Sequence, residues 1–149
     1  MAGEIVIRDL GEDDREAWNP LWAGYLAFYK SNLTQEISDL SWTRFHDPSE
    51  QIYALGGFLD GRLTGIAHYL FHRSTWALHR YCYLEDLFVA QAARGRGLGR
   101  ALIEAVYGRA EAANASRVYW LTHSDNAEAR RLYDKVASNL GFIQYRKVL

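Results

Sequence analysis

The chain has 149 residues, a net charge of −1 and a hydrophobic fraction of 49%, which fits one globular domain spanning residues 1–149 and excludes a disordered chain. Residues 1–10 carry Glu4, Arg8 and Asp9 and no long apolar run, so we expect neither a signal peptide nor a membrane span, and hence a cytoplasmic protein. The single cysteine excludes an internal disulfide, and the five histidines lack the spacing of metal ligands, so we expect no metal.

The first half of the sequence predicts a strand, two helices and a hairpin. Residues 4–8 alternate in hydrophobicity and predict a strand, and residues 12–29 predict a helix with acidic residues in its first turn and an apolar stripe. Residues 33–46 predict a second helix, which Thr34 begins. Residues 52–59 and 63–71 flank Asp60-Gly61, a dipeptide typical of a tight turn, so they predict a β-hairpin.

The second half predicts the rest of the sheet and two more helices. Residues 79–89 predict the central strand of an antiparallel meander, and residues 98–113 predict a helix. The strand at residues 117–122 follows this crossover helix and should lie parallel to the central strand. Residues 126–140 predict a helix that Gly141 caps in a left-handed conformation, and residues 142–148 predict the strand that closes the sheet. The order predicts an α/β fold with a mixed, mostly antiparallel central sheet and helices on both faces.

Residues 94–100, with the sequence Arg-Gly-Arg-Gly-Leu-Gly-Arg, form a glycine-rich loop between the central strand and the next helix. Glycines lack a Cβ atom and let a ligand approach the backbone, and the helix start presents unpaired amides at the positive end of its dipole. Arg94, Arg96 and Arg100 add cationic donors. The loop therefore predicts an anion site, and a ligand that carries a pyrophosphate.

Two interpretations of this loop are open at this point. The spacing of Gly95, Gly97 and Gly99 is not G-x-G-x-x-G, and no lysine followed by Ser or Thr closes a P-loop. A plain turn between a strand and a helix, with solvated arginines, fits the loop as well as a phosphate site does. The loop alone does not decide between them.

A second motif distinguishes the two interpretations. After the strand at residues 117–122 come Asn126, Ala129 and Tyr133, and later Gly141-Phe142. Together with the Arg-x-x-Gly-x-Gly pattern of residues 94–99, this segment resembles the acetyl-CoA signature and closing segment of the GCN5-related N-acetyltransferases (GNAT family). The resemblance covers most of the chain from residue 81 onward, and it implies the GNAT fold, acetyl-CoA as co-substrate and N-acetyl transfer. Seven residues separate Tyr133 from Gly141 where the family commonly has about three, so we expect a helix about one turn longer.

The resemblance also implies which residues hold acetyl-CoA. The amides of Arg96, Gly97, Gly99 and Arg100 would bind the pyrophosphate, and the strand amide of Val89 would polarise the thioester carbonyl. Asn126 would hydrogen-bond the pantetheine arm, although an ordinary helix N-cap explains an asparagine there nearly as well. The residues expected to contact the cofactor are Leu87, Phe88, Val89, Arg94, Gly95, Arg96, Gly97, Leu98, Gly99, Arg100, Asn126 and Tyr133.

Acetyl transfer to an amine needs a base, a stabilised oxyanion and a proton for the departing thiolate. Tyr133 matches the family's general acid, and the simpler alternative is a buried helix aromatic. For the base, strict strand alternation places Glu85 on the face of Leu87 and Val89, and Asp86 on the opposite face. We therefore favour Glu85 as the base, with Asp86 as the alternative, and one of the two carboxylates can instead form a structural salt bridge.

The uneven distribution of charge suggests a cationic acceptor. Residues 1–50 carry ten acidic and four basic side chains, a net charge of −6, and residues 91–149 carry five acidic and ten basic side chains, a net charge of +5. A basic half suits the polyphosphate of CoA and an acidic half suits a polyamine, a lysine or a small basic amino compound, although solvated helix faces explain part of either. The residues expected to bind this substrate are Tyr25, Tyr29, Tyr83, Glu85 and Asp86.

Finer resemblances and alternatives complete the prediction. The ending Gly-Phe-Ile-Gln-Tyr-Arg-Lys-Val-Leu resembles the histone and polyamine acetyltransferase branch, and Leu-Glu-Asp at residues 84–86 resembles the spermidine/spermine acetyltransferases. A non-catalytic acyl-CoA sensor is an alternative that Tyr133 and Glu85 argue against, and a nucleotide binder is another. The aromatic surplus and the terminal strand suggest a homodimer, and we expect neither nucleic acid nor a membrane as a partner.

Overall fold

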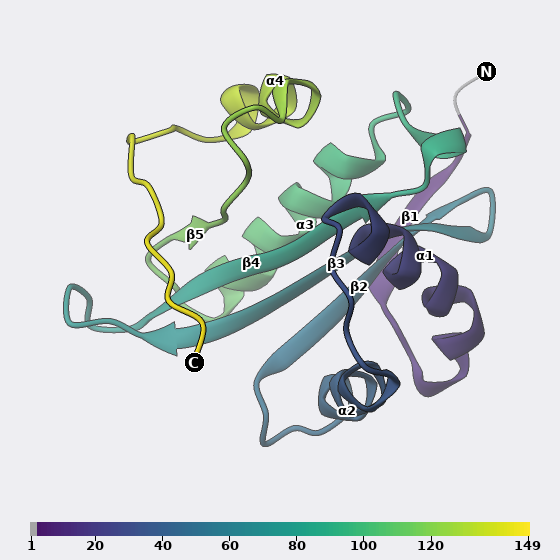
Figure 1. The fold of residues 1–149 in the computed structure, drawn as a ribbon, viewed down its shortest axis with the longest axis horizontal. Coiled ribbons are helices and arrows are strands. Elements are labelled where there is room, and N and C mark those ends of the chain that lie inside the picture. The colour runs from purple at the N-terminus through teal and green to yellow at the C-terminus, as the bar shows by residue number, and fades with distance from the viewer. Residues whose placement is uncertain (1–2) are drawn as a thin grey trace.

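The computed structural model describes residues 3–149, in which one five-stranded sheet carries helices on both faces (Figure 1). The strands β1 to β4 pair antiparallel with their neighbours, and β5 joins β4 in parallel. This mixed, mostly antiparallel sheet confirms the predicted α/β fold. In order across the sheet, the strands are β1 (Ile5–Asp9), β2 (Ile52–Leu59), β3 (Arg62–Arg73), β4 (Arg80–Val89) and β5 (Val118–Tyr119).

The helices form where the sequence predicts them, with small shifts at their ends. Thr34 begins α2 as expected, because its hydroxyl oxygen accepts a hydrogen bond from the Ile37 N–H at 3.4 Å. Helices α1 and α2 cover one face of the sheet and α3 covers the other (Figure 1). The helices are η1 (Glu12–Asp14), α1 (Arg15–Phe28), α2 (Gln35–Phe45), η2 (Gln91–Ala93), α3 (Leu98–Ala112) and α4 (Ala127–Val136).

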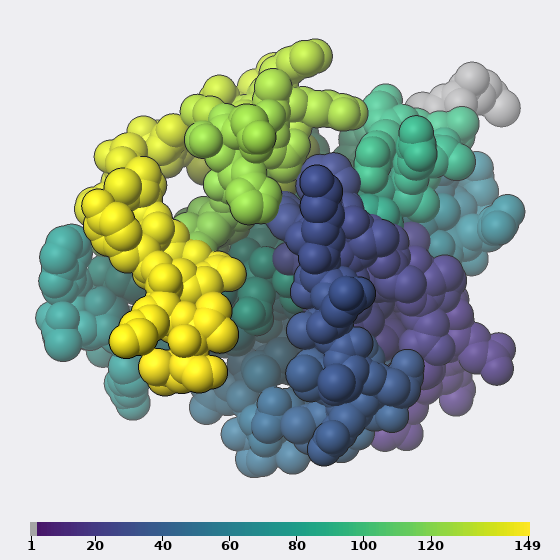
Figure 2. All heavy atoms as spheres, viewed as in Figure 1, coloured from purple at the N-terminus to yellow at the C-terminus, as the bar shows by residue number. Residues whose placement is uncertain are grey.

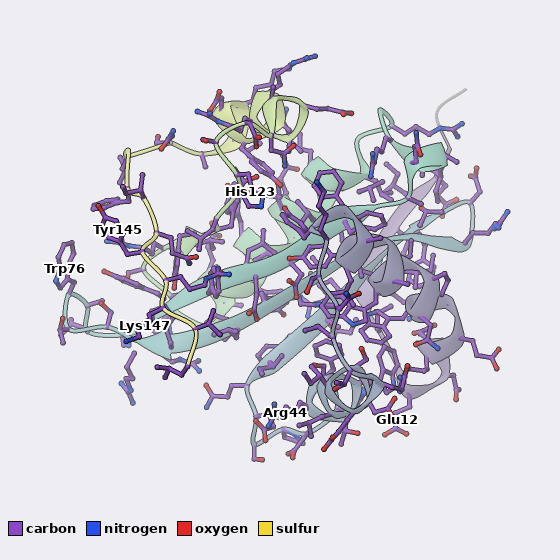
Figure 3. All side chains as sticks on the ribbon, in the orientation of Figure 1. Glu12, Arg44, Trp76, His123, Tyr145 and Lys147 are labelled. Atoms are coloured by element: carbon purple, nitrogen blue, oxygen red, sulfur yellow. The ribbon has the colours of Figure 1, made fainter. Side chains whose placement is uncertain are left out.

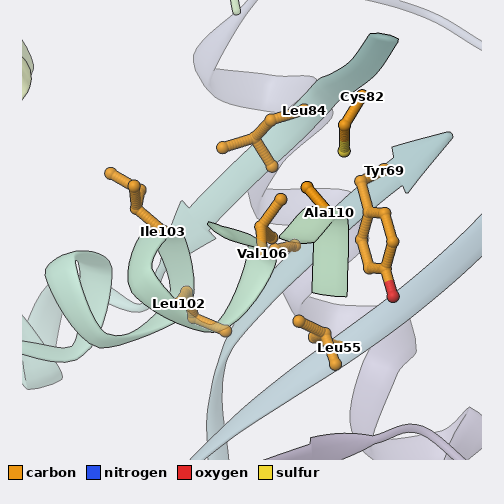
Figure 4. Close-up of a cluster of buried hydrophobic side chains, with 9 residues drawn as sticks. Leu55, Tyr69, Cys82, Leu84, Leu102, Ile103, Val106 and Ala110 are labelled. Carbon is orange, nitrogen blue, oxygen red and sulfur yellow. The ribbon is translucent and has the colours of Figure 1, made fainter. Parts of the chain in front are cut away.

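Two buried clusters hold the layers together. Between α3 and the sheet, Leu102, Ile103 and Val106 are fully buried against residues of β2 to β4 (Figure 4). Each such side chain stabilises the fold by about 1.5–3 kcal/mol through removal from water. Cys82 lies in this cluster, and burial raises the pKa of its thiol to about 12, so it is packed and unreactive at neutral pH. On the other face, Trp18 of α1 has no exposed surface and lies in a second buried cluster, which also includes Trp42 of α2.

A bulge in β4 changes which residues share a face of the sheet. Tyr69 of β3 lies opposite Leu84, and His68 lies opposite Asp86, so Glu85 is an extra residue without a partner in the β3 register. The prediction of strict alternation along β4 is therefore wrong beyond Leu84. Leu84 and Leu87 both pack toward α3, and Asp86 faces the α1 side through its contact with His68.

The C-terminal part differs from the prediction in three respects. Strand β5 has two residues rather than six, and α4 ends at Val136 rather than near residue 140. Gly141 does have a positive φ of 82°, but it lies beyond the helix and does not cap it. At Gly141 the Asn139 side-chain oxygen accepts the Gly141 N–H at 2.9 Å, which holds this part of the chain in a turn.

Residues 137–149 belong to no helix or strand within the part of the chain that the structure describes. The predicted strand at residues 142–148 is therefore absent there, and its large side chains are exposed, Phe142 by 84% and Tyr145 by 91%. Figure 2 shows this segment as a separate band along one side of the molecule, from α4 toward the β3–β4 hairpin. A strand needs a neighbour with free backbone groups alongside it, and β5 is too short to provide a paired edge.

Candidate active site

The site is built where β4 and β5 separate. The two strands pair only at Cys82 with Val118 and at Tyr83 with Tyr119, while β4 continues to Val89. Beyond Tyr119 the chain turns away toward α4, which leaves a narrow cleft along the free edge of β4. The residues that line this β4/β5 cleft are Tyr25, Tyr29, Leu84, Glu85, Leu87, Trp120, Leu121 and Tyr133.

The free edge of β4 directs backbone groups toward the open side. The Ala90 N–H donates to the Thr64 carbonyl at 2.8 Å, so this pair is hydrogen-bonded to β3. Since hydrogen-bonded and non-hydrogen-bonded pairs alternate along antiparallel strands, Leu87 and Val89 point their N–H and C=O groups away from β3. In agreement, the Val89 carbonyl accepts a hydrogen bond from Arg94 Nε at 3.0 Å. The Val89 amide therefore faces the side that β5 leaves open.

Glu85 reaches the cleft because it is the bulged residue. It remains exposed to solvent there, yet partial removal of water from its carboxylate raises its pKa. The neighbouring charge of Asp86 raises the pKa of Glu85 further. A carboxylate with a raised pKa is better matched to proton transfer near neutral pH than an ordinary glutamate.

Tyr133 lies on the same cleft, held by α4. Its ring packs edge-on against Trp120, with ring centroids 5.4 Å apart. Burial, with a smaller contribution from Tyr29, raises the pKa of Tyr133 to about 12. The phenol therefore keeps its proton, and can act as a donor, well above neutral pH.

Helix α1 supplies the aromatic side of the cleft. Tyr25 stacks on Trp22 with a centroid separation of 5.2 Å, and Tyr29 packs against Tyr25 at 4.9 Å. Burial raises the pKa of both phenols, and the nearby Asp86 carboxylate adds to the effect. Tyr83, expected at the substrate site, instead stacks on Tyr119 at the point where β4 and β5 separate, outside the cleft lining.

The glycine loop has the geometry of an anion site. Gly95 and Gly97 have φ angles of 79° and 87°, which favour glycine, and no heavy atom would lie within 4 Å of a Cβ atom at either position. The first backbone bond of α3 runs from the Ala101 N–H to the Gly97 carbonyl at 3.0 Å. Helix geometry thus leaves the amides of the first turn without intrahelical partners and open to a ligand.

The basic and amide side chains predicted to bind the cofactor are partly engaged within the protein. Arg94 Nε is bonded to the Val89 carbonyl, and Arg100 Nε pairs with Glu104 at 2.9 Å. Asn126 occupies the N-cap position of α4, but its side chain donates to the Thr122 hydroxyl at 3.1 Å rather than capping the helix. Arg94 therefore anchors the loop to the end of β4, whatever it contributes to a bound anion.

The structure brings five of the predicted site residues onto one cleft: Tyr25, Tyr29, Glu85, Leu87 and Tyr133. Sequence reasoning missed Leu84, Trp120 and Leu121, since the prediction placed all three in paired strands. The aromatic and aliphatic character of Trp120 and Leu121 was the one available signal for these two. A second surface hollow of about 460 Å³ lies at α2, away from every predicted site residue, and its lining is Glu12, Trp42, Thr43, His46, Asp47 and Pro48.

Comparison with known proteins places this geometry in a family. The sequence matches the Acetyltransferase (GNAT) family over residues 7–137. The chain belongs to the GNAT family. A D-amino-acid N-acetyltransferase of Saccharomyces cerevisiae is 37% identical over 145 residues, which cover 96% of this chain and 90% of that protein. The protein is therefore an N-acetyltransferase, and like other GNAT enzymes it uses acetyl-CoA.

Solved structures share the fold of this GNAT enzyme. The ribosomal-protein-alanine N-acetyltransferase of Brucella melitensis biovar Abortus 2308 matches with a TM-score of 0.77 and 22% identity, over 98% of this chain and 100% of that one. AAC(6')-Iy, in complex with the bisubstrate analogue CoA-S-monomethyl-acetylneamine, matches with a TM-score of 0.82 and 17% identity, over 98% and 99% of the two chains. In this GNAT chain, within residues 3–149, no helix is long and apolar enough to cross a membrane.

We expect Gly97→Asp to abolish acetyl-CoA binding while the enzyme stays folded. The side chain has room, but it places a carboxylate against the anion site and strains a backbone with φ of 87°. Calorimetric titration with acetyl-CoA measures the loss. Gly61→Asp is the matched control, because Gly61 has φ of 81°, equally open surroundings and a place on the β2–β3 turn. Equal affinities in Gly97→Asp and the wild type would remove the loop from the cofactor site.

Proposed function

We propose that the enzyme transfers an acetyl group from acetyl-CoA directly to the primary amine of a cationic acceptor. The observation that carries this proposal is the β4/β5 cleft, on which a carboxylate with a raised pKa and a phenol that keeps its proton lie together. Such a pair can accept a proton from one reactant and donate a proton to another. The cleft runs along the strand that leads into the glycine loop.

Residues 94–100 form the proposed cradle for the pyrophosphate of acetyl-CoA. The open surroundings of Gly95 and Gly97 and the free amides at the start of α3 support this assignment. The edge of β4 at Leu87, Phe88 and Val89 would hold the acyl end, and the Asn126 side chain would reach the pantetheine arm. Arg94 fits this arrangement because it ties the loop to the Val89 carbonyl.

The proposed reaction uses one residue for each charge that develops. Glu85 takes a proton from the acceptor ammonium, directly or through a water molecule. The amine nitrogen then bonds to the acetyl carbon, and the Val89 amide stabilises the oxyanion. When the carbon–sulfur bond breaks, Tyr133 donates its proton to the departing thiolate. The amide nitrogen loses its second proton, which returns through water to the Tyr133 phenolate, and Glu85 releases the proton it took to bulk water.

The surroundings of the cleft support a cationic acceptor. Glu85 lies on the cleft with the Asp86 carboxylate next to it in the chain, and Tyr25 and Tyr29 of the cleft offer aromatic faces that suit an ammonium group. The polyamine and histone branch is the proposed affiliation. The 37% identical relative acts on D-amino acids by its name, so amino acids are the second acceptor class to test.

A panel of amines with acetyl-CoA and detection of released thiol tests this function. We expect turnover with polyamines or lysine, and Glu85→Gln should retain acetyl-CoA binding and lose most turnover. Because the pKa of Glu85 is raised, wild-type rates should fall as the pH drops through that pKa, and Glu85→Gln should lack this limb.

The controls separate the acceptor from the activity. Turnover only with D-amino acids would support the proposed acetyl transfer and contradict the proposed cationic acceptor. Acetyl-CoA binding without turnover on any amine would favour the non-catalytic sensor.

Tyr133→Phe distinguishes a catalytic phenol from a packed ring. The change keeps the ring and deletes the hydroxyl, so a packing role predicts nearly unchanged turnover. A general acid predicts a loss of roughly 100- to 10,000-fold with cofactor affinity kept. Since burial raises the pKa of Tyr133 to about 12, the wild-type rate should not fall near pH 10, where a free phenol ionises. If chemistry is rate-limiting and the variant keeps full turnover, Tyr133 has only a packing role.

The proposal includes a homodimer and a cytoplasmic location. Trp76 at the tip of the β3–β4 hairpin is 79% exposed, and Phe142, Ile143 and Tyr145 of the C-terminal segment are 76–91% exposed. Figure 3 places Trp76, Tyr145 and Lys147 on the same side of the molecule. Exposed apolar surface of this kind supports a second copy as partner. The single cysteine, buried and reduced, suits a reducing compartment.

Light scattering at micromolar concentration tests the homodimer. We expect twice the mass of one chain, and the mass of one chain for Ile143→Asp, because a charge opposes burial of this segment. Ile37→Asp on α2 is the matched control, since Ile37 is 44% exposed and lies away from the segment. A wild-type protein with the mass of one chain would end this idea.

A further inference from the structure

A chain of two buried hydrogen bonds lies behind the β4/β5 cleft. The Trp18 indole N–H donates to His68 Nε2 at 3.0 Å, and His68 Nδ1 lies 2.9 Å from Asp86 Oδ2. Trp18 has no exposed surface, and the side chains of His68 and Asp86 are 4% and 13% exposed. The chain thus connects α1, β3 and β4 beneath the surface.

The first hydrogen bond fixes the position of the proton on His68. An indole nitrogen can only donate, so His68 Nε2 must carry the lone pair. The ring proton therefore sits on Nδ1, and Asp86 Oδ2 accepts it. Trp22 and Phe45 pack around the imidazole, with ring centroids 5.2 Å and 4.6 Å from its own, which restricts its rotation.

The second hydrogen bond joins the two strands next to the bulge. His68 and Asp86 are direct neighbours across β3 and β4, and the register shifts immediately beside them. An alternative pairing that placed Glu85 opposite His68 would remove the bulge and turn Glu85 toward the α1 core. The hydrogen bond between His68 and Asp86 opposes that slip, because an unpaired buried carboxylate is costly.

Several titratable groups face Glu85 besides Asp86. His68 approaches from β3, and the phenols of Tyr25, Tyr83 and Tyr119 interact electrostatically with Glu85 from α1, β4 and β5. Tyr29 and Tyr133 share its cleft. Phenols are neutral near neutral pH, so Asp86 is the negative charge among these groups.

We infer that Trp18, His68 and Asp86 are positioning residues that hold the Glu85 bulge in place and keep a negative charge beside the Glu85 carboxylate. The inference rests on the proposed function only in giving Glu85 the role of base, since the arrangement itself does not depend on any substrate. Asp86 acts through Glu85 in this arrangement, and the two hydrogen bonds connect Asp86 to Trp18 in the core. Trp18 fixes the tautomer of His68, and the Nδ1 proton of His68 holds the Asp86 carboxylate. The charge of Asp86 then raises the pKa of Glu85.

Titration of Glu85 by carbon-13 NMR tests the inference without any acceptor. The protein is labelled with glutamate enriched at the side-chain carboxyl carbon, and the Glu85 signal is assigned by its loss in Glu85→Gln. We expect the Glu85 titration midpoint to lie above that of the other glutamates. In Asp86→Asn, which keeps an oxygen to accept the His68 proton, the midpoint should fall by roughly one pH unit.

Asp39→Asn is the matched control. Asp39 lies on α2, pairs with Arg15 at the surface and should leave the Glu85 midpoint unchanged. An unchanged midpoint in folded Asp86→Asn, with circular dichroism like that of the wild type, would overturn the inference. So would an equal shift in Asp39→Asn, since the effect would then be one of overall charge.

A second measurement on the wild type keeps the inference testable if Asp86→Asn fails to fold. Nitrogen-15 NMR of histidine-labelled protein, assigned by the loss of the signal in His68→Gln, distinguishes the two tautomers. We expect a protonated Nδ1 and an unprotonated Nε2 for His68 near neutral pH, and the opposite tautomer would overturn the chain. Failure of the amine panel leaves both measurements intact, so the failure of the proposed function and of this inference are separable.

Discussion

The separation of β4 from β5 beyond Tyr83 is the constraint on which the site depends. Tyr83 stacks on Tyr119 at that point, with ring centroids 4.9 Å apart, and the Tyr119 hydroxyl donates to His72 Nε2 at 2.6 Å. These contacts fix where the parallel pairing stops. The chain after Tyr119 then turns so that Trp120 packs against Tyr133 instead of extending the sheet. The free edge of β4 and the cleft follow from this, while the pairing of β4 with β3 sets the direction of the Val89 amide.

The bulge at Glu85 adds the chemistry that a regular strand would lack. In a regular strand, successive side chains point to opposite faces of the sheet. Leu84 and Leu87 would then lie on opposite faces. The extra residue lets Leu84 and Leu87 both pack toward α3 while Glu85 faces the cleft and Asp86 faces His68. Two adjacent carboxylates thereby obtain different environments, the arrangement by which proteins assign different protonation roles to like groups.

Many of the aromatic residues lie between the sheet and helices α1 and α2 or line the cleft. Trp18, Trp22 and Trp42 form the core between the sheet and helices α1 and α2, and Tyr25 and Tyr29 continue this stack to the cleft. The same row of rings therefore anchors α1 and lines the site. A buried histidine within it is satisfied at both nitrogens, which is the condition for retaining polar groups in such a core.

The sequence by itself determined the order of elements as far as α4, the hairpin at Asp60-Gly61, the start of α3 within the glycine loop and the family. These depend on local propensities and short motifs, which residues nearby in the chain carry. It also named Glu85 and Tyr133 as candidates, whose place on one cleft only the tertiary structure decided. The tertiary structure alone decided the bulge, the early end of β5, the end of α4 and the partner of Asp86. Each depends on cross-strand register or on contacts between residues far apart in the chain, and a periodic pattern along one strand does not contain that information.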